Sequence, residues 1–147
     1  MEKYNDRRES RPEVCETRGS AWVVDQDWQD VQGYAGVLRH LGFDVEPFTN
    51  YQEASRRLEE ESPDFVFVNQ GTAAFEAREV LMGALARSHR TPVVVLTRSL
   101  NMGCYLEAMQ LGAADYVEVP LTPAEVEHLV TTHLQPRALK ARTTARP

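Results

Sequence analysis

Short runs of valine and other apolar residues alternate along this chain with longer amphipathic segments. The apolar runs lie at 21–24, around Val45, and at 65–68, 93–96 and 116–119. The amphipathic segments span residues 28–41, 50–60, 73–88, 101–111 and 123–134. This alternation predicts parallel strands joined by crossover helices, and continuous Val-rich runs suit strands buried on both faces. The expected fold class is therefore α/β, with a five-stranded, doubly wound parallel sheet.

The expected helix ends carry residues that commonly cap helices. These are Gly42 after the first helix, Thr49 or Asn50 before the second, Asn101 before the fourth, and Thr122 with Pro123 before the fifth. Ser, Thr, Asn and Asp accept hydrogen bonds from free backbone N–H groups at a helix start, proline fits the first helical position, and glycine suits the residue after the end. The caps support the predicted boundaries.

Charge divides the chain into three parts. Residues 1–20 hold five acidic and five basic residues and lack apolar periodicity, which predicts a disordered leader. Residues 21–134, the predicted domain, hold seventeen Asp and Glu against seven Lys and Arg, a net charge of −10. Residues 135–147 hold four basic residues and no acidic ones, which suggests a basic tail or linker.

This charge pattern limits the possible partners. An acidic domain repels phosphate backbones, so we expect no nucleic-acid binding by the folded part. No stretch approaches the roughly 20 apolar residues that a membrane helix needs. The two cysteines, Cys15 and Cys104, match no metal-ligand spacing, and the chain shows no signal peptide. We therefore expect a cytoplasmic protein with reduced thiols.

Polar residues follow three of the predicted strands: Asp25, Asn69 and Thr97. Together with the segment from Gly112 to Tyr116, they resemble the landmarks of a response-regulator receiver domain, which implies a flavodoxin-like sheet. The segment 108–120, AMQLGAADYVEVP, is similar to receivers of the nitrogen-regulator class of transcription activators.

In that family, an acidic pair and an acceptor aspartate hold magnesium, while a threonine and a lysine contact the phosphoryl group. The resemblance places the acidic pair at Asp25 and Gln26, the acceptor at Asn69, the threonine at Thr97 and the lysine at Val119. Three of the five positions depart from the pattern.

Each departure removes a different part of the chemistry. The amide of Asn69 cannot form an acyl phosphate, Gln26 supplies no charge for magnesium, and Val119 supplies no cation for a phosphoryl group. We interpret the chain as a degenerate, or pseudo-, receiver without a metal, a cofactor or catalytic residues. The pattern also lacks HExxH, GxGxxG and P-loop motifs.

The fourth predicted helix offers a candidate partner-binding surface. Met102, Tyr105 and Met109 form one stripe at helical spacing, and Leu106 begins a neighbouring stripe. We expect one stripe to pack on the sheet and the other to remain partly exposed. The resemblance places Tyr105 on a partner-contacting face, and it pairs Thr97 with Tyr116 as the residues that couple phosphorylation to that face. We therefore group Tyr116 with Met102, Tyr105 and Met109 as candidate partner-binding residues. Ordinary core packing is an alternative for all these residues.

Three hypotheses follow. The first is a phosphorylation-independent signalling module that binds another protein or itself. The second is the regulatory domain of a transcription factor whose output domain lies outside this sequence. The third is a small-molecule binder that uses the pocket left by the altered site. An enzyme is not expected, because no nucleophile, base and orienting group can be placed together.

Overall fold

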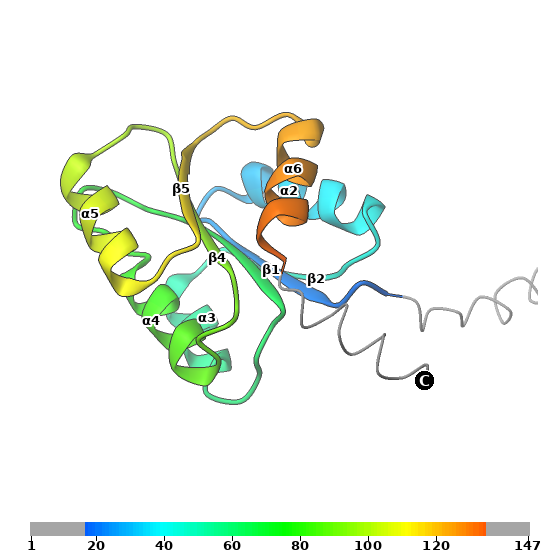
Figure 1. Ribbon diagram of the computed structural model, residues 1–147, viewed down its shortest axis with the longest axis horizontal. Helices are drawn as coiled ribbons and strands as arrows, with labels where there is room; N and C mark the ends of the chain where they lie inside the picture. Colours follow the sequence, from blue (N-terminus) through cyan, green and yellow to red (C-terminus); the bar gives the residue numbers. More distant parts are fainter. Residues whose placement is uncertain (1–16, 135–147) are drawn as a thin grey trace, which may run out of the picture.

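Five short parallel strands form one sheet at the centre of the computed structural model, which describes residues 17–134 (Figure 1). The strands are β1 (Ser20–Val24), β2 (Asp44–Phe48), β3 (Phe65–Asn69), β4 (Val93–Thr97) and β5 (Asp115–Glu118). Their order across the sheet is β2-β1-β3-β4-β5, and all four neighbouring pairs are parallel. The predicted α/β sheet is confirmed.

Helices cover both faces of the sheet (Figure 1). They are α2 (Trp28–His40), α3 (Tyr51–Arg57), α4 (Arg78–Arg87), α5 (Met102–Leu111) and α6 (Pro123–His133). One face is covered by α2 and α6, and the other by α3, α4 and α5. None of these helices, within residues 17–134, is long and apolar enough to cross a membrane.

The two central strands explain this layering. Every residue of β3 (FVFVN) and β4 (VVVLT) is buried. Because side chains alternate along a strand, Val66 and Val68 join the core beneath α3 to α5, while Phe65 and Phe67 join the core beneath α2 and α6. A sheet that is apolar on both faces needs a helical layer on each side.

The expected caps are present at four helices. Asn50, rather than Thr49, caps α3 by accepting a hydrogen bond from Glu53 N (2.9 Å), and Asn101 caps α5 in the same way from Cys104 N (2.9 Å). Thr122 forms a reciprocal capping box with Glu125 at α6. Gly42 follows α2 with a φ of +102°, a conformation that favours glycine.

Two predicted helix boundaries were wrong. Helix α3 ends at Arg57, before the expected residue 60, and α4 begins at Arg78 instead of residue 73. The Glu76 carboxylate folds back to accept a hydrogen bond from Thr72 N (2.6 Å), and Phe75 adopts a φ of 60° that a helix does not allow. The segment before Arg78 is therefore a turn.

Residues just before the predicted domain boundary at 21 are also bonded to the fold. Strand β1 starts at Ser20, and Arg18 N donates a hydrogen bond to the Gly42 carbonyl (2.9 Å). This contact ties residues before the strand to the end of α2. The remainder of the predicted leader, residues 1–16, and the predicted basic tail, residues 135–147, lie outside the described residues.

Candidate functional site

The carboxyl ends of β1, β3 and β4 meet around a hollow of about 440 Å³. Parallel strands bring these ends to the same edge of the sheet, which is where α/β proteins of this kind bind ligands. Four residues that the sequence singled out line the hollow: Asp25, Gln26, Asn69 and Thr97. The fold therefore assembles most of the predicted site.

Asp25 is a buried carboxylate. Its Oδ1 accepts a hydrogen bond from Asp27 N (2.9 Å), and its own N–H donates to the Phe48 carbonyl (3.0 Å). Burial raises the pKa of Asp25 above its ordinary value, and the hydrogen bond from Asp27 offsets only part of this effect. Gln26 beside it is exposed and uncharged.

Asn69 is bonded within its own loop at the end of β3. Its Oδ1 accepts a hydrogen bond from Gly71 N (2.8 Å), and its backbone carbonyl accepts one from the Tyr51 hydroxyl (2.9 Å). Gly71 has a φ of +89°, where a Cβ would lie only 2.3 Å from the Glu76 carboxylate. The side chain of Asn69 thus stabilises a tight turn that requires glycine.

The hydroxyl of Thr97 is also bonded within its own loop. It donates to the Ser99 carbonyl (2.8 Å) and accepts from Ser99 N (3.1 Å). The hydroxyl therefore shapes the loop between β4 and α5, and a ligand in the hollow would compete with these two bonds.

Arg98 is a site residue that the sequence analysis missed. Its guanidinium forms ion pairs with Asp27 (3.1 Å) and with Asp30, both from the start of α2. These carboxylates lie about 70 residues from Arg98 in the chain. Spacing along the sequence gives no signal for such a contact, which depends on β4 and β1 ending at one edge.

Comparison with known proteins identifies the family. A model of the response regulator receiver domain matches residues 21–131. The chain belongs to this family.

Named relatives agree with this assignment. The transcriptional regulatory protein CreB of Escherichia coli is 30% identical over 122 residues, which cover 80% of this chain and 52% of CreB. The DNA-binding transcriptional regulator NtrC of the same species is 27% identical over 113 residues, covering 77% of this chain and 24% of NtrC. The chain therefore spans about half of CreB and about a quarter of NtrC.

A solved structure supports the fold. The CheY-like receiver domain protein from Methanospirillum hungatei aligns with a TM-score of 0.74 at 18% identity, covering 83% of this chain and 97% of that one. This likeness concerns the receiver fold alone. It agrees with the expected flavodoxin-like sheet.

Val119 is bonded to the predicted site through its backbone only. It does not line the hollow. Its N–H donates to the Thr97 carbonyl (2.9 Å), and its side chain packs partly against the core beneath α2 and α6. In this receiver domain, the position that would hold a lysine is therefore part of the packing.

The hollow does not fit the divalent metal that the receiver family implies. Magnesium prefers anionic oxygen ligands in octahedral geometry. Asp25 supplies one carboxylate and Gln26 none, while Arg98 engages the neighbouring carboxylates of Asp27 and Asp30. Within residues 17–134, no group of three His, Cys, Asp or Glu side chains is placed to hold a metal ion.

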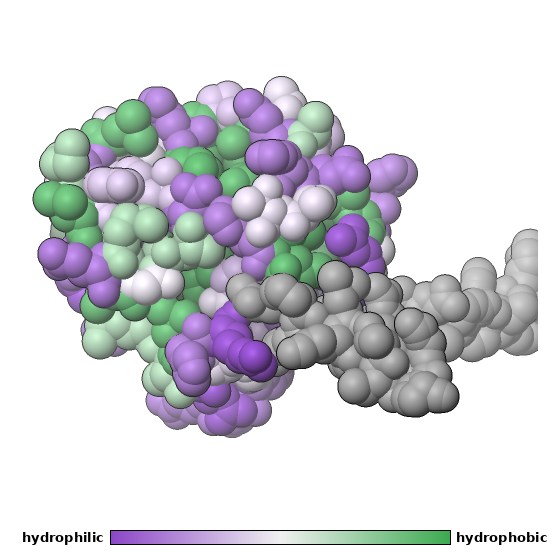
Figure 2. Space-filling model, in the orientation of Figure 1, coloured by the Kyte–Doolittle hydropathy of each residue, from purple (hydrophilic) through white to green (hydrophobic). Residues whose placement is uncertain are grey.

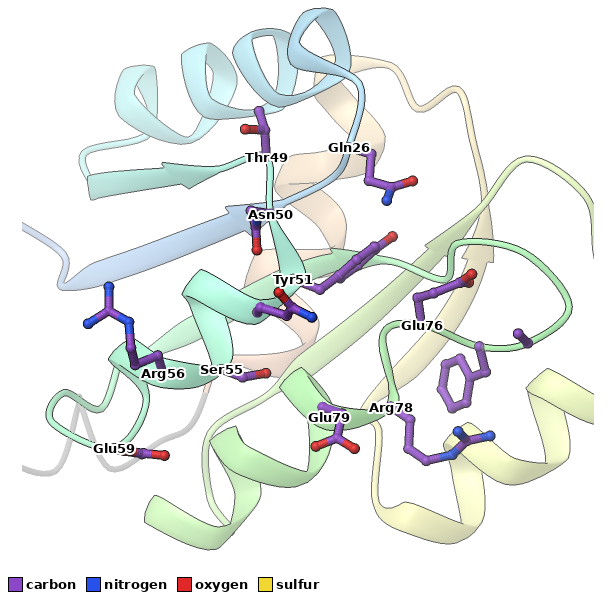
Figure 3. Close-up of a pocket in the computed structure, with 13 residues that line it drawn as sticks. Gln26, Thr49, Asn50, Tyr51, Ser55, Arg56, Glu59, Glu76, Arg78 and Glu79 are labelled. Atoms are coloured by element: carbon purple, nitrogen blue, oxygen red, sulfur yellow. The ribbon is translucent and has the colours of Figure 1, made fainter.

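A second hollow of about 850 Å³ opens between α3 and the segment that leads into α4 (Figure 3). Gln26 lines both hollows. The Tyr51 ring points into the space between Gln26 and Glu76. Burial raises the pKa of Tyr51, so its hydroxyl stays protonated and keeps its hydrogen bond to Asn69.

The predicted stripes on α5 are both exposed. Exposed fractions are 69% for Met102, 41% for Tyr105, 50% for Leu106 and 37% for Met109. The prediction that one stripe packs on the sheet was wrong. The small side chains of Cys104 and Ala108 make that contact instead. We call the exposed side chains of Met102, Tyr105, Leu106 and Met109 the α5 face.

Tyr116, which the sequence analysis grouped with the partner-binding residues, is buried beneath the α5 face. Its ring packs edge-on against Tyr105, with 5.6 Å between centroids. Its hydroxyl donates to Gln70 Oε1 and accepts from Asn101 N (3.1 Å). Gln70, a second residue that the sequence analysis missed, thereby joins the hollow to the start of α5. Tyr116 supports the face from inside and is not itself part of the surface.

The raised pKa of Asp25 predicts that Asp25→Asn stabilises the protein at neutral pH. Because the native pKa lies above the ordinary value of 3.8, the charged carboxylate costs free energy in the folded state. This cost is fully present above the native pKa and disappears below the unfolded value. The difference in unfolding free energy between variant and wild type, measured by urea denaturation, should therefore be positive at pH 7, shrink as the pH falls through the native pKa, and vanish below 3.8.

Asp44→Asn, at an exposed position in β2, makes the same change in net charge and serves as the control. A stabilisation by Asp25→Asn that is equally large at low pH, or that the control reproduces, would contradict the assignment to buried charge.

Proposed function

We propose that this receiver domain is a phosphorylation-independent signalling module that acts by binding another protein through the α5 face. The observation that carries the proposal is the residue at the end of β3. The family resemblance puts the phosphate acceptor there, and this chain has Asn69. On this proposal the domain is a pseudo-receiver and not an enzyme.

The chemistry of Asn69 supports the first half of the proposal. An amide nitrogen is not a nucleophile toward phosphorus, so it forms no acyl phosphate. The amide oxygen is already bonded to Gly71 N (2.8 Å). Val119 and Gln26 supply neither the cation nor the carboxylate that would offset phosphoryl charge and hold magnesium.

The α5 face supports the second half. Four large apolar side chains gather on one helix, and Tyr and Met suit protein interfaces because one is a rigid amphipathic ring and the other adapts its shape. The Tyr116 hydroxyl is bonded to Gln70 and Asn101, and these bonds fix the position of the ring that packs against Tyr105. The face is thus preorganised without a covalent modification.

A second candidate function is the regulatory domain of a longer transcription regulator. CreB and NtrC are transcriptional regulators by name, and this chain matches 52% and 24% of their lengths. The two functions are compatible, because a regulatory domain also acts through a protein surface. A reading frame that continues past Pro147 into a DNA-binding domain would establish this second candidate.

Phosphorylation independence predicts that the wild-type protein gains no phosphoryl group from acetyl phosphate and Mg²⁺, as measured by intact mass spectrometry. A variant with Gln26→Asp, Asn69→Asp and Val119→Lys restores the acceptor, the acidic pair and the cation, and should gain one phosphoryl group under the same conditions. A modified wild type would overturn the proposal.

Partner binding predicts a loss of complex formation in the double variant Tyr105→Ser, Met109→Ser. Central aromatic and apolar anchors carry most of the binding energy of an interface, so affinity for a partner captured from native lysate should fall at least about tenfold. Trp28→Ser with Met82→Ser removes two comparably exposed side chains from α2 and α4 and is the matched control. Equal capture by both variants, with unfolding curves showing that each is folded, would rule out the α5 face.

A further inference from the structure

The part of the chain that carries the α5 face is rich in acidic residues and lacks basic ones. Between Arg98 and Arg137 there is no Lys or Arg, while five acidic residues occur: Glu107, Asp115, Glu118, Glu125 and Glu127. This stretch forms α5, β5 and α6. All three elements therefore share one sign of formal charge.

Three of the five carboxylates have partners within the fold. Glu107 pairs with Arg78, Asp115 accepts from His133 Nε2 (3.1 Å) and Glu125 completes the α6 capping box. Glu118 and Glu125 are exposed and line one hollow beside β5; the Glu118 carboxylate forms no hydrogen bond or ion pair within the described range 17–134, and the Glu125 carboxylate accepts a bond from the Thr122 backbone N–H. These two charges remain available to a partner.

The apolar and acidic groups lie on one continuous edge of the molecule. Strand β5 is the edge strand, and the contact of Tyr105 with Tyr116 joins α5 to it. On the other side, a hollow of about 410 Å³ joins β5 to α6 and is lined by Val117, Glu118, Leu121 and Leu129, among others. We call this hollow the edge groove. Figure 2 shows hydrophobic residues on the left side of the molecule, where α5 lies in Figure 1.

We propose that the partner of this edge is a protein segment that combines Lys or Arg with apolar side chains, such as a basic amphipathic helix. This inference rests on the proposed function and specifies the partner's chemistry. Apolar side chains of the segment would cover the α5 face and the edge groove, while its cations would meet Glu118 and Glu125 at the groove. Complementary potentials of this kind favour encounter and fix the orientation of a complex.

The same charges disfavour other occupants. Nucleic acid and anionic membranes present phosphate to this edge and would be repelled. A second copy of the chain on a symmetric interface would bring the same acidic patch against itself, and no Lys or Arg of α5, β5 or α6 is available to balance it. The chain's own residues 135–147, with four cations, are a competing occupant that a test must separate.

The test uses three fluorescent helical peptides with one common leucine pattern and Lys, Gln or Glu at the polar positions, with binding followed by anisotropy. Wild type should bind the Leu/Lys peptide more tightly than the Leu/Gln peptide, and should not bind the Leu/Glu peptide. The double variant Glu118→Lys, Glu125→Lys, shown to be folded by its urea unfolding curve because Glu125 also caps α6, should weaken Leu/Lys binding at least about tenfold and gain binding of the Leu/Glu peptide, because the sign of the edge is reversed.

The matched control is Glu59→Lys with Glu60→Lys. It changes the net charge equally at two exposed positions just after α3, which α4 separates from α5. The control should alter Leu/Lys binding less than about threefold, the size of effect expected from net charge alone. If both double variants weaken binding equally, the attraction is general and the proposal is wrong.

The outcomes separate the partner's chemistry from the proposed function. If Tyr105→Ser, Met109→Ser weakens peptide binding but reversal of Glu118 and Glu125 does not, the α5 face is supported and the basic partner is overturned. If only the charge reversal weakens peptide binding, the role of the acidic edge is supported and binding through the apolar α5 face is contradicted.

Two further measurements address the competing occupants. A concentration-dependent dimer in sedimentation, lost with Tyr105→Ser, Met109→Ser, would place a second copy on the face and overturn the proposal. In the full chain, changing the four cations of residues 135–147 to Gln would tighten Leu/Lys binding at least about tenfold if that segment already occupied the edge. That result would also contradict the proposal that a separate protein binds this edge. An unchanged affinity would support the proposal.

Discussion

Burial of β3 and β4 on both faces is the constraint on which the rest of the structure depends. Every apolar side chain of these two strands enters one of two cores, so helices must cover the sheet from both sides, as crossover helices between parallel strands do. Parallel strands then end at one edge, which brings Asp25, Asn69 and Thr97 together. This assembly follows from packing alone and does not depend on what the assembled residues do. This receiver fold therefore accommodates the amide of Asn69 at the end of β3 without any loss of core.

At that edge, polar groups satisfy one another inside the protein. Asn69 bonds to Gly71, Thr97 bonds to Ser99, and Arg98 pairs with two carboxylates at the start of α2. Buried polar groups without partners are costly, so residues that bind no ligand need internal partners to remain there. The observed bonds meet this requirement. They explain how a hollow with the shape of a receiver site can be stable while its side chains serve the loops around it.

Sequence patterns predicted the features that depend on local chemistry and failed for those that depend on distant contacts. Val-rich runs gave the five strands, and Asn50, Asn101 and Thr122 marked helix starts, because capping acts within a few residues. The predicted start of α4 was too early because the Glu76 side chain bonds back to Thr72 and forms a turn there. Helix propensity does not predict this side-chain bond. Arg98 and Gln70 were missed because their partners are far away in sequence. The α5 stripes were misjudged because large apolar residues were assumed to pack, whereas Cys104 and Ala108 allow a closer approach to the sheet.

The contact chain from Gln70 through Tyr116 to Asn101 and Tyr105 gives the edge of the sheet a connection to the α5 face. A connection of this kind transmits a signal only if some ligand has different affinities for two arrangements of the chain. On the proposal that Asn69 accepts no phosphoryl group, a change at the face has to come from binding at the face itself or at one of the hollows. A partner that bound only the Tyr105 arrangement seen here would stabilise it without moving any element. The proposed partner therefore needs a preformed surface and no switch, and the complementarity of the apolar and acidic groups on that surface would determine what it binds.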